Sequence, residues 1–209
     1  MVVSTIIKPG TRLAVFGRSG SGKTYFEKWS MLRSRMKWIV LDSKHDNGFD
    51  DWTPEKGLIP MSRIGRLWAD KNVVVIRPSP IENKPEFLDT YLGELHDAFD
   101  GFGVCIDETY QVALGSKPGA GLTGLVTRGR ARKQSVILGS QRPAWVPQFC
   151  FSEANAMVIM SLTLEADRKK VFQNTGQIAV MYPVPPRVWL YYDVASNEMT
   201  RYSAVTITG

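Results

Sequence analysis

The sequence predicts an α/β fold built on a doubly wound, mostly parallel β-sheet. Short apolar runs rich in β-branched residues recur along the chain without alternating with polar residues, which is typical of strands buried on both faces. Stretches with helical spacing of apolar residues separate these runs. A glycine-rich loop joins the first run to the first helical stretch. Strands alternating with helices indicate right-handed crossovers and a parallel sheet.

The apolar runs define the expected strands, which are 13–16, 38–41, 73–76, 104–106, 136–138 and 157–160. Helices are expected at 24–36, at 85–99 with Pro85 in the first turn, around 122–126, and at 164–173. After Gly176 the pattern changes, and 178–182 and 188–193 are expected to be strands that extend one edge of the sheet. The sequence thus predicts one domain over 1–209, with a core of about 10–175 and a C-terminal strand extension of about 176–209.

Composition excludes several classes of protein. Of 209 residues, 44% are hydrophobic and 22% charged, which is ordinary for globular domains and excludes disorder, collagen and disulfide scaffolds. The net charge of +6 is compatible with a polyanionic partner. Cys105 and Cys150 both lie between apolar neighbours, so we expect buried free thiols in a reducing compartment. No apolar run approaches the roughly 18 residues of a membrane span, and no signal peptide is evident, so we expect a soluble intracellular protein.

A phosphate-binding loop is predicted at residues 17–24. The segment fits G-x-x-x-x-G-K-[ST] and stands between a strand and a helix, as the mechanism requires. Its backbone N–H groups and the helix N-terminus would bind phosphate oxygens. Lys23 would reach the β- and γ-phosphates, and the Thr24 hydroxyl would bind Mg²⁺. The whole predicted cofactor-binding set is Gly17, Arg18, Ser19, Gly20, Ser21, Gly22, Lys23 and Thr24.

Two carboxylates follow the apolar run at 104–106. Asp107 is expected to hold Mg²⁺, and Glu108 to orient or deprotonate the attacking water, because the end of a neighbouring parallel strand lies beside the γ-phosphate. Gln141 follows the run at 136–138 and would hydrogen-bond the attacking water or the γ-phosphate; an ordinary strand exit is the alternative.

A cationic segment lies between these two strand ends, with Arg128, Arg130, Arg132 and Lys133 in six residues. It is a solvated basic helix end, an arginine finger, or a set of contacts to nucleic-acid phosphates. The glycine-rich segment 110–124 is either a DNA-contacting loop driven by the hydrolytic site or a simple connection.

Together these motifs resemble the FtsK–HerA superfamily of P-loop motor ATPases, and most closely the genome-packaging ATPases of membrane-containing double-jelly-roll viruses. The resemblance rests on 17–24, on Asp107-Glu108, on Ser-Gln-Arg-Pro at 140–143, and on Asp-Ser-Lys at 42–44. Arg130 stands eleven residues before Gln141, the spacing at which the family carries an arginine that reaches a neighbouring subunit's nucleotide.

The resemblance implies a RecA-like P-loop NTPase core. It also implies an ATP-hydrolysing, Mg²⁺-dependent motor that moves double-stranded DNA without sequence specificity, most simply into a viral capsid. It further implies a homo-oligomer, in the form of a ring, that docks on capsid or vertex proteins in the host cytoplasm or the virion. Catalysis would rest on Lys23, Glu108, Gln141 and Arg130, with Thr24 and Asp107 on the metal.

Three other functions stay open from the sequence. A nucleoside or nucleotide kinase would share the size, the P-loop and an arginine-rich lid, although Glu108 and Gln141 suit water activation better. A conjugation or phage-extrusion motor is a near relative that usually carries membrane segments. A nucleotide-stabilised structural protein would not need Lys23, Thr24 and Glu108.

Overall fold

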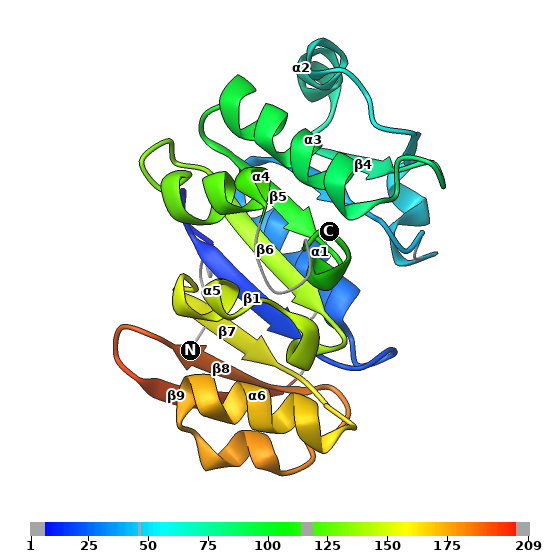
Figure 1. Ribbon diagram of the computed structural model, residues 1–209. Helices are drawn as coiled ribbons and strands as arrows, with labels where there is room; N and C mark the ends of the chain where they lie inside the picture. The colour runs from blue at the N-terminus through cyan, green and yellow to red at the C-terminus, as the bar shows by residue number, and fades with distance from the viewer. Residues whose placement is uncertain (1–6, 46, 114–118, 204–209) are drawn as a thin grey trace.

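The computed structural model describes residues 7–45, 47–113 and 119–203. They form a nine-stranded sheet in the order β3-β4-β2-β5-β6-β1-β7-β8-β9 (Figure 1). Strands β1 to β7 run parallel, and β8 and β9 are antiparallel additions at one edge. The strands are β1 Arg12–Phe16, β2 Lys37–Leu41, β3 Glu55–Lys56, β4 Val73–Arg77, β5 Phe102–Ile106, β6 Ser135–Ser140, β7 Ala156–Ile159, β8 Val188–Asp193 and β9 Glu198–Ser203.

Helices cover both faces of the sheet. The helix α1 packs on one face, and Figure 1 shows α3, α4, α5 and α6 along the other. The α-helices are α1 Lys23–Ser34, α2 Met61–Asp70, α3 Pro85–Ala98, α4 Ala120–Thr123, α5 Gln148–Ser152 and α6 Glu165–Thr175. Shorter turns are η1 Asn47–Trp52, η2 Thr109–Gln111, η4 Pro143–Trp145 and η5 Ile178–Met181, and η3 Gly124–Arg128 is a π-helical turn that continues α4.

The core is divided by the sheet into two layers. Along β1, Leu13 and Val15 point into the layer under α1, whereas Ala14 and Phe16 point into the layer under α3 to α6. All four side chains are fully buried, which explains why the strand sequence shows no polar alternation. The α/β class, the parallel sheet and each of the six expected central strands are therefore confirmed.

The expectation of a strand at 178–182 is wrong. These residues form the 3₁₀ turn η5, in which Val180 is buried beside α6 while Ile178 is 61% exposed. The following Pro183 and Pro185 have no N–H to donate to a ladder, so the segment is unsuited to a paired strand. Strand β8 pairs with β7 on one side and with β9 on the other, and the sequence pattern did not indicate β9.

Two further expectations concern the two cysteine thiols and the presence of a membrane-spanning helix. Cys105 and Cys150 are both buried free thiols, as expected. Burial raises the pKa of the Cys150 thiol to about 12, which keeps it protonated and inert. Across the described ranges, no helix combines the length and the apolar character that a membrane crossing requires.

The strand order determines where the functional loops meet. Strand β6 lies between β1 and β5, and β2 lies on the other side of β5. Because these strands are parallel, the loops that follow β1, β2, β5 and β6 leave from the same edge of the sheet. The residues predicted to bind phosphate, metal and water all belong to these loops.

Candidate nucleotide-binding site

The glycine-rich loop begins where β1 ends, and its conformation depends on its glycines. The Gly17 N–H donates to the Ser140 carbonyl at 3.2 Å, and a Cβ on Gly17 would stand 2.4 Å from Ser21 Oγ. Gly22 has a φ of 99° immediately before α1, a conformation that L side chains rarely adopt. The loop is open to a ligand, because its exposed residues are Arg18, Ser19, Gly20 and Gly22.

Lys23 is the first residue of α1 and points into the site rather than into solvent. Its side chain is 5% exposed, and its Nζ lies 3.6 Å from Asp107 Oδ1. Burial acts to lower the pKa of Lys23, but the carboxyls of Glu27, Asp107 and Glu108 outweigh burial and raise the pKa. The ammonium therefore stays charged, as binding of β- and γ-phosphates requires.

Asp107 fits the role of a metal ligand. It is fully buried at the end of β5, and within the described residues neither carboxylate oxygen accepts a hydrogen bond from a hydroxyl, amide or ammonium group. A buried oxygen without a donor is costly unless a ligand satisfies it. Thr24, half-buried at the start of α1, adds a hydroxyl oxygen of the kind that Mg²⁺ accepts. The residues present thus suit Mg²⁺.

Glu27 is a site residue that the sequence reasoning missed. It lies one helical turn after Lys23 and is completely buried. Burial raises the pKa of Glu27 far above its usual value, and the nearby Asp107 raises it further through a shared hydrogen bond. The raised pKa favours the protonated form of Glu27 beside Asp107. The only signal in the sequence is an acidic residue on the apolar face of α1.

Glu108 is fully buried and is held by three groups. Its Oε1 accepts hydrogen bonds from Ser140 Oγ at 2.6 Å and from the Gln141 backbone N–H at 2.8 Å. Its Oε2 forms an ion pair with Lys44 Nζ at 3.0 Å. The end of β6 therefore positions the candidate base through Ser140 and the main chain of Gln141. Sequence reasoning placed Gln141 on water or phosphate and assigned Lys44 no contact with the site.

The structure does not bring Arg130 to this site. A Cβ built on Gly10 would lie 3.5 Å from Arg130 Cγ, so Arg130 stands near the beginning of β1, whereas the phosphate loop follows its end. Roughly 16 Å of strand separates the two, at about 3.3 Å per residue. Arg130 and Arg128 are exposed, while Arg132 forms an ion pair with Asp100 at 2.5 Å.

At the beginning of β1, Arg12 holds the turn that leads to the cationic segment. The buried Arg12 guanidinium donates to the Val126 carbonyl at 2.6 Å and to the Gly10 carbonyl at 2.7 Å. Burial and the nearby Arg130 lower the pKa of Arg12. Of the expected loop at 110–124, residues 114–118, including Lys117 and Pro118, lie outside the described residues.

The fold and this constellation define a fold class: the P-loop NTPase fold with a strand inserted between the phosphate-loop strand and the carboxylate strand. The chain is 28% identical over 165 residues to the DNA packaging ATPase P9 of Enterobacteria phage PRD1, covering 77% of this chain and 68% of that protein. No protein-family model matches the chain. The resemblance to packaging ATPases that the motifs indicate is thereby confirmed.

Solved structures agree on the fold. The genome packaging NTPase B204 of Sulfolobus turreted icosahedral virus 2, in complex with AMPPCP, superposes with a TM-score of 0.78 at 16% identity, over 95% of this chain and 99% of that one. The pCW3 conjugation coupling protein TcpA, with ATPγS, gives a TM-score of 0.64 at 15% identity, over 93% of this chain and 60% of that one.

Proposed function

We propose that this protein is an ATP-hydrolysing motor that packages double-stranded DNA into a viral capsid. The observation that carries the proposal is the joint placement of Lys23, Asp107 and Glu108 at the edge of the sheet where β6 ends. Similarity in sequence to a phage packaging ATPase and in fold to a viral packaging NTPase supports packaging as the task. None of the relatives reported above is a kinase.

The chemistry follows from the contacts of each group. The phosphate loop and Lys23 would bind the triphosphate of ATP, and Thr24 and Asp107 would hold Mg²⁺. When bound, the metal neutralises charge on the β- and γ-phosphates. Glu108 would take a proton from the attacking water, and Gln141 would orient that water. Phosphoryl transfer needs positioning and charge neutralisation more than covalent chemistry, which these residue types supply.

The position of Arg130 supports an oligomer. This arginine is exposed at the opposite end of β1 from the phosphate loop of its own chain. If it stabilises transition-state charge, it must do so in the site of a neighbouring copy. A head-to-tail contact of this kind is heterologous, and it forms a ring when the rotation between successive copies closes. We therefore propose a homo-oligomeric ring with ATP at the subunit interfaces.

DNA and the capsid are the proposed macromolecular partners. A net charge of +6 favours contact with phosphates, which carries no base specificity. Capsid or vertex proteins would anchor the ring during assembly in the host cytoplasm or on the virion.

An ATPase assay with and without double-stranded DNA tests the proposal. We expect ATP hydrolysis that DNA stimulates, with Glu108→Gln as the inactive control. Transfer of the γ-phosphate to a nucleoside would instead identify a kinase, and a chain that neither hydrolyses ATP nor binds DNA would contradict the motor.

A further inference from the structure

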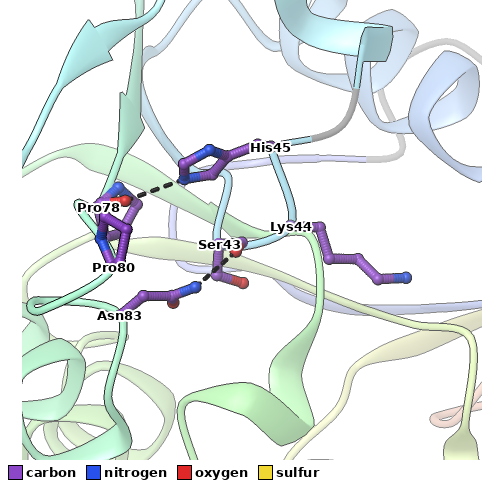
Figure 2. Close-up of a pocket in the computed structure, with 6 residues that line it drawn as sticks. All are labelled: Ser43, Lys44, His45, Pro78, Pro80 and Asn83. Atoms are coloured by element: carbon purple, nitrogen blue, oxygen red, sulfur yellow. Dashed lines mark hydrogen bonds between the residues drawn. The ribbon is translucent and has the colours of Figure 1, made fainter.

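The carboxylate of Glu108 is held from two sides, by residues on different elements. Its Oε2 pairs with Lys44, which belongs to the turn after β2. Figure 2 shows a bond that fixes the backbone of that turn, in which Asn83 donates to the Ser43 carbonyl at 2.8 Å. The support of the other oxygen, Oε1, extends over several residues and reaches a helix that the proposed mechanism does not use.

The hydroxyl of Ser140 is oriented by its neighbours. A serine hydroxyl has one proton to donate and two lone pairs that accept. Ser140 Oγ accepts the Arg142 backbone N–H at 3.0 Å, and an N–H group can only donate. An ionised carboxylate only accepts, so the hydroxyl proton is directed to Glu108 Oε1, 2.6 Å away. The Arg142 N–H therefore sets the orientation of the hydroxyl that holds the base.

Arg142 is fixed in turn by Asp167, which lies in the first turn of α6. Asp167 Oδ2 accepts from Arg142 Nε at 3.1 Å, and its Oδ1 accepts from the Ala144 backbone N–H at 3.0 Å. One carboxylate thus holds a side chain and a main-chain group that are two residues apart. Pro143 stands between them, and its ring fixes its own backbone φ angle. The turn that follows Gln141 is therefore clamped to α6 at two points.

Most of this chain of contacts is shielded from water. Glu108 and Ser140 are fully buried, and Asp167 is 1% exposed. The guanidinium of Arg142 lies over the Trp145 ring, 4.1 Å from the ring centroid, so an aromatic face packs against it. Hydrogen bonds are electrostatically stronger in a dry interior than in water, and the loss of one partner is costly there. The contacts from Asp167 to Glu108 are therefore suited to hold the base in one geometry.

We propose that Asp167 is a positioning residue for Glu108 and acts through Arg142 and Ser140. Asp167 holds the turn, the turn orients the Ser140 hydroxyl, and the hydroxyl fixes Oε1. A general base works only within hydrogen-bond reach of its water, so a small displacement of Glu108 slows hydrolysis without weakening nucleotide binding. Helix α6, which carries none of the sequence motifs of the site, thereby contributes to catalysis. This inference rests on the proposed function, because it concerns the base of the same ATPase site.

Asp167→Asn tests the proposal through the separate effects on turnover and binding. Asn can still accept from the Ala144 N–H, but its NH₂ group then faces Arg142 Nε, donor against donor. We expect kcat for ATP hydrolysis to fall about tenfold, the factor that corresponds to loss of one charge-assisted hydrogen bond. The Kd for ATP should stay within about twofold, because Asp167 orients the base and not the phosphates. Steady-state hydrolysis and equilibrium nucleotide binding measure the two quantities.

Two further variants serve as controls. Arg142→Lys keeps a cation for Asp167 and should lose less activity than Asp167→Asn. Asp193→Asn removes the charge of another aspartate that accepts a backbone N–H, from Ser196 at 2.9 Å, at the end of β8. It should change neither kcat nor the Kd for ATP.

A double-mutant cycle with Ser140→Ala tests whether Asp167 acts through the hydroxyl. Ser140→Ala removes the last link to Glu108, so adding Asp167→Asn to it should lower kcat no further. Two losses that multiply would overturn the route through Ser140. Arg142→Met breaks the same ion pair from its 30% exposed partner, and the same cycle with this variant decides the question if Asp167→Asn does not fold.

The outcomes separate this inference from the function beneath it. A wild-type protein without ATPase activity contradicts the proposed function, and the inference falls with it. Active wild-type protein together with an Asp167→Asn variant of unchanged kcat overturns the positioning role alone. A variant whose affinity for ATP falls as much as its kcat also overturns that role, because Asp167 would then support the nucleotide site as a whole.

Discussion

Three buried carboxyl groups lie near the Lys23 ammonium, and each has a different set of partners. Burial raises the pKa of Glu27, and the oxygens of Asp107 accept no hydrogen bond within the described residues. Glu108 is held by Ser140, Gln141 and Lys44. Three carboxyl groups, one on α1 and two after β5, thus lie in three different environments. These differences support the proposed roles of a protonated Glu27, a metal-binding Asp107 and a basic Glu108.

Glu27→Gln tests the protonation of Glu27 through stability. The pKa of Glu27 is raised in the folded protein above its ordinary value of 4.5, so its stabilising contribution is complete below that pH and is lost as pH rises. Gln keeps the shape and a donor but cannot ionise. We expect wild-type stability to fall relative to the variant by up to about 1.4 kcal/mol per pH unit between pH 5 and pH 7. Urea unfolding at several pH values measures the free energy of unfolding of both proteins. Free energies that change equally with pH in the wild type and the variant would refute a neutral Glu27.

Glu108→Gln tests the base. Gln retains an oxygen for Ser140 Oγ and the Gln141 N–H but cannot accept a proton from water. We expect ATP binding to persist while hydrolysis falls by about two or more orders of magnitude. Phosphate release and equilibrium nucleotide binding measure the two effects separately. Near-normal turnover would move the role to Asp107 or Gln141.

The residues of the site differ in how far the sequence could predict them. Lys23 lies in a contiguous motif, and Asp107 and Glu108 follow a strand, so their placement could be read from the chain order alone. Glu27 and Lys44 gain their meaning only from partners on other elements. A one-residue change in the register of β2 on β5 would remove the Lys44 contact, and no local pattern specifies that register.

At the scale of elements, β6 connects the parts of the site. Its Gly139 lies directly under α1 and beside β5: a Cβ there would stand 2.6 Å from Glu27 Oε1 and 2.7 Å from the Asp107 carbonyl oxygen. Its Ser140 carbonyl accepts from Gly17, and its Ser140 hydroxyl donates to Glu108. The strand therefore needs a glycine at this point to bring three functional elements together.

Gly139→Ala should disturb both stability and turnover. The added methyl has no room against the Asp107 backbone, so we expect a loss of about 1 to 3 kcal/mol in the free energy of unfolding and slower hydrolysis. Gly65→Ala in α2 is the matched control, because nothing lies within 4 Å of its Cβ position. That control should stabilise the helix by about 0.5 to 1 kcal/mol. Equal effects of the two variants in denaturant titrations would contradict the close approach at Gly139.

Two of the elements that the sequence did not predict, β9 and α2, have little buried surface. In β9 no residue is buried, and in α2 the buried set is Ile64 alone. Hydrophobic periodicity detects buried faces, so it detects the central strands and overlooks edge strands and exposed helices. The run at 178–182 is apolar in sequence, yet it forms a turn in which Val180 is the buried residue.

At the scale of the whole molecule, the proposal of a ring depends on Arg130. Arg130→Ala should bind ATP normally and reduce turnover by a factor on the order of 10³. A Lys23→Ala subunit should bind little ATP but retain the arginine. Mixing the two inactive variants should restore partial activity at interfaces that combine an intact phosphate loop with an intact arginine. Arg132→Ala is the neighbouring control, because Arg132 is paired with Asp100 in its own chain.

Two results of that experiment would count against action in trans. Mixtures that stay inactive at all ratios, despite forming mixed oligomers, would show that Arg130 does not complete a neighbour's site or that the ring requires every subunit intact. An Arg130→Ala protein that keeps DNA-free hydrolysis but loses DNA stimulation would assign Arg130 to DNA phosphates. The slope of the logarithm of DNA affinity against the logarithm of salt concentration would then be smaller by about one.

The most direct measurement of the central claim is movement along DNA. A short third strand bound to double-stranded DNA reports translocation when the motor displaces it. We predict displacement by the wild-type protein with ATP, and none by Glu108→Gln or with a non-hydrolysable ATP analogue. A wild-type protein that hydrolyses ATP in the presence of this DNA and yet never displaces the third strand would contradict a DNA-translocating motor.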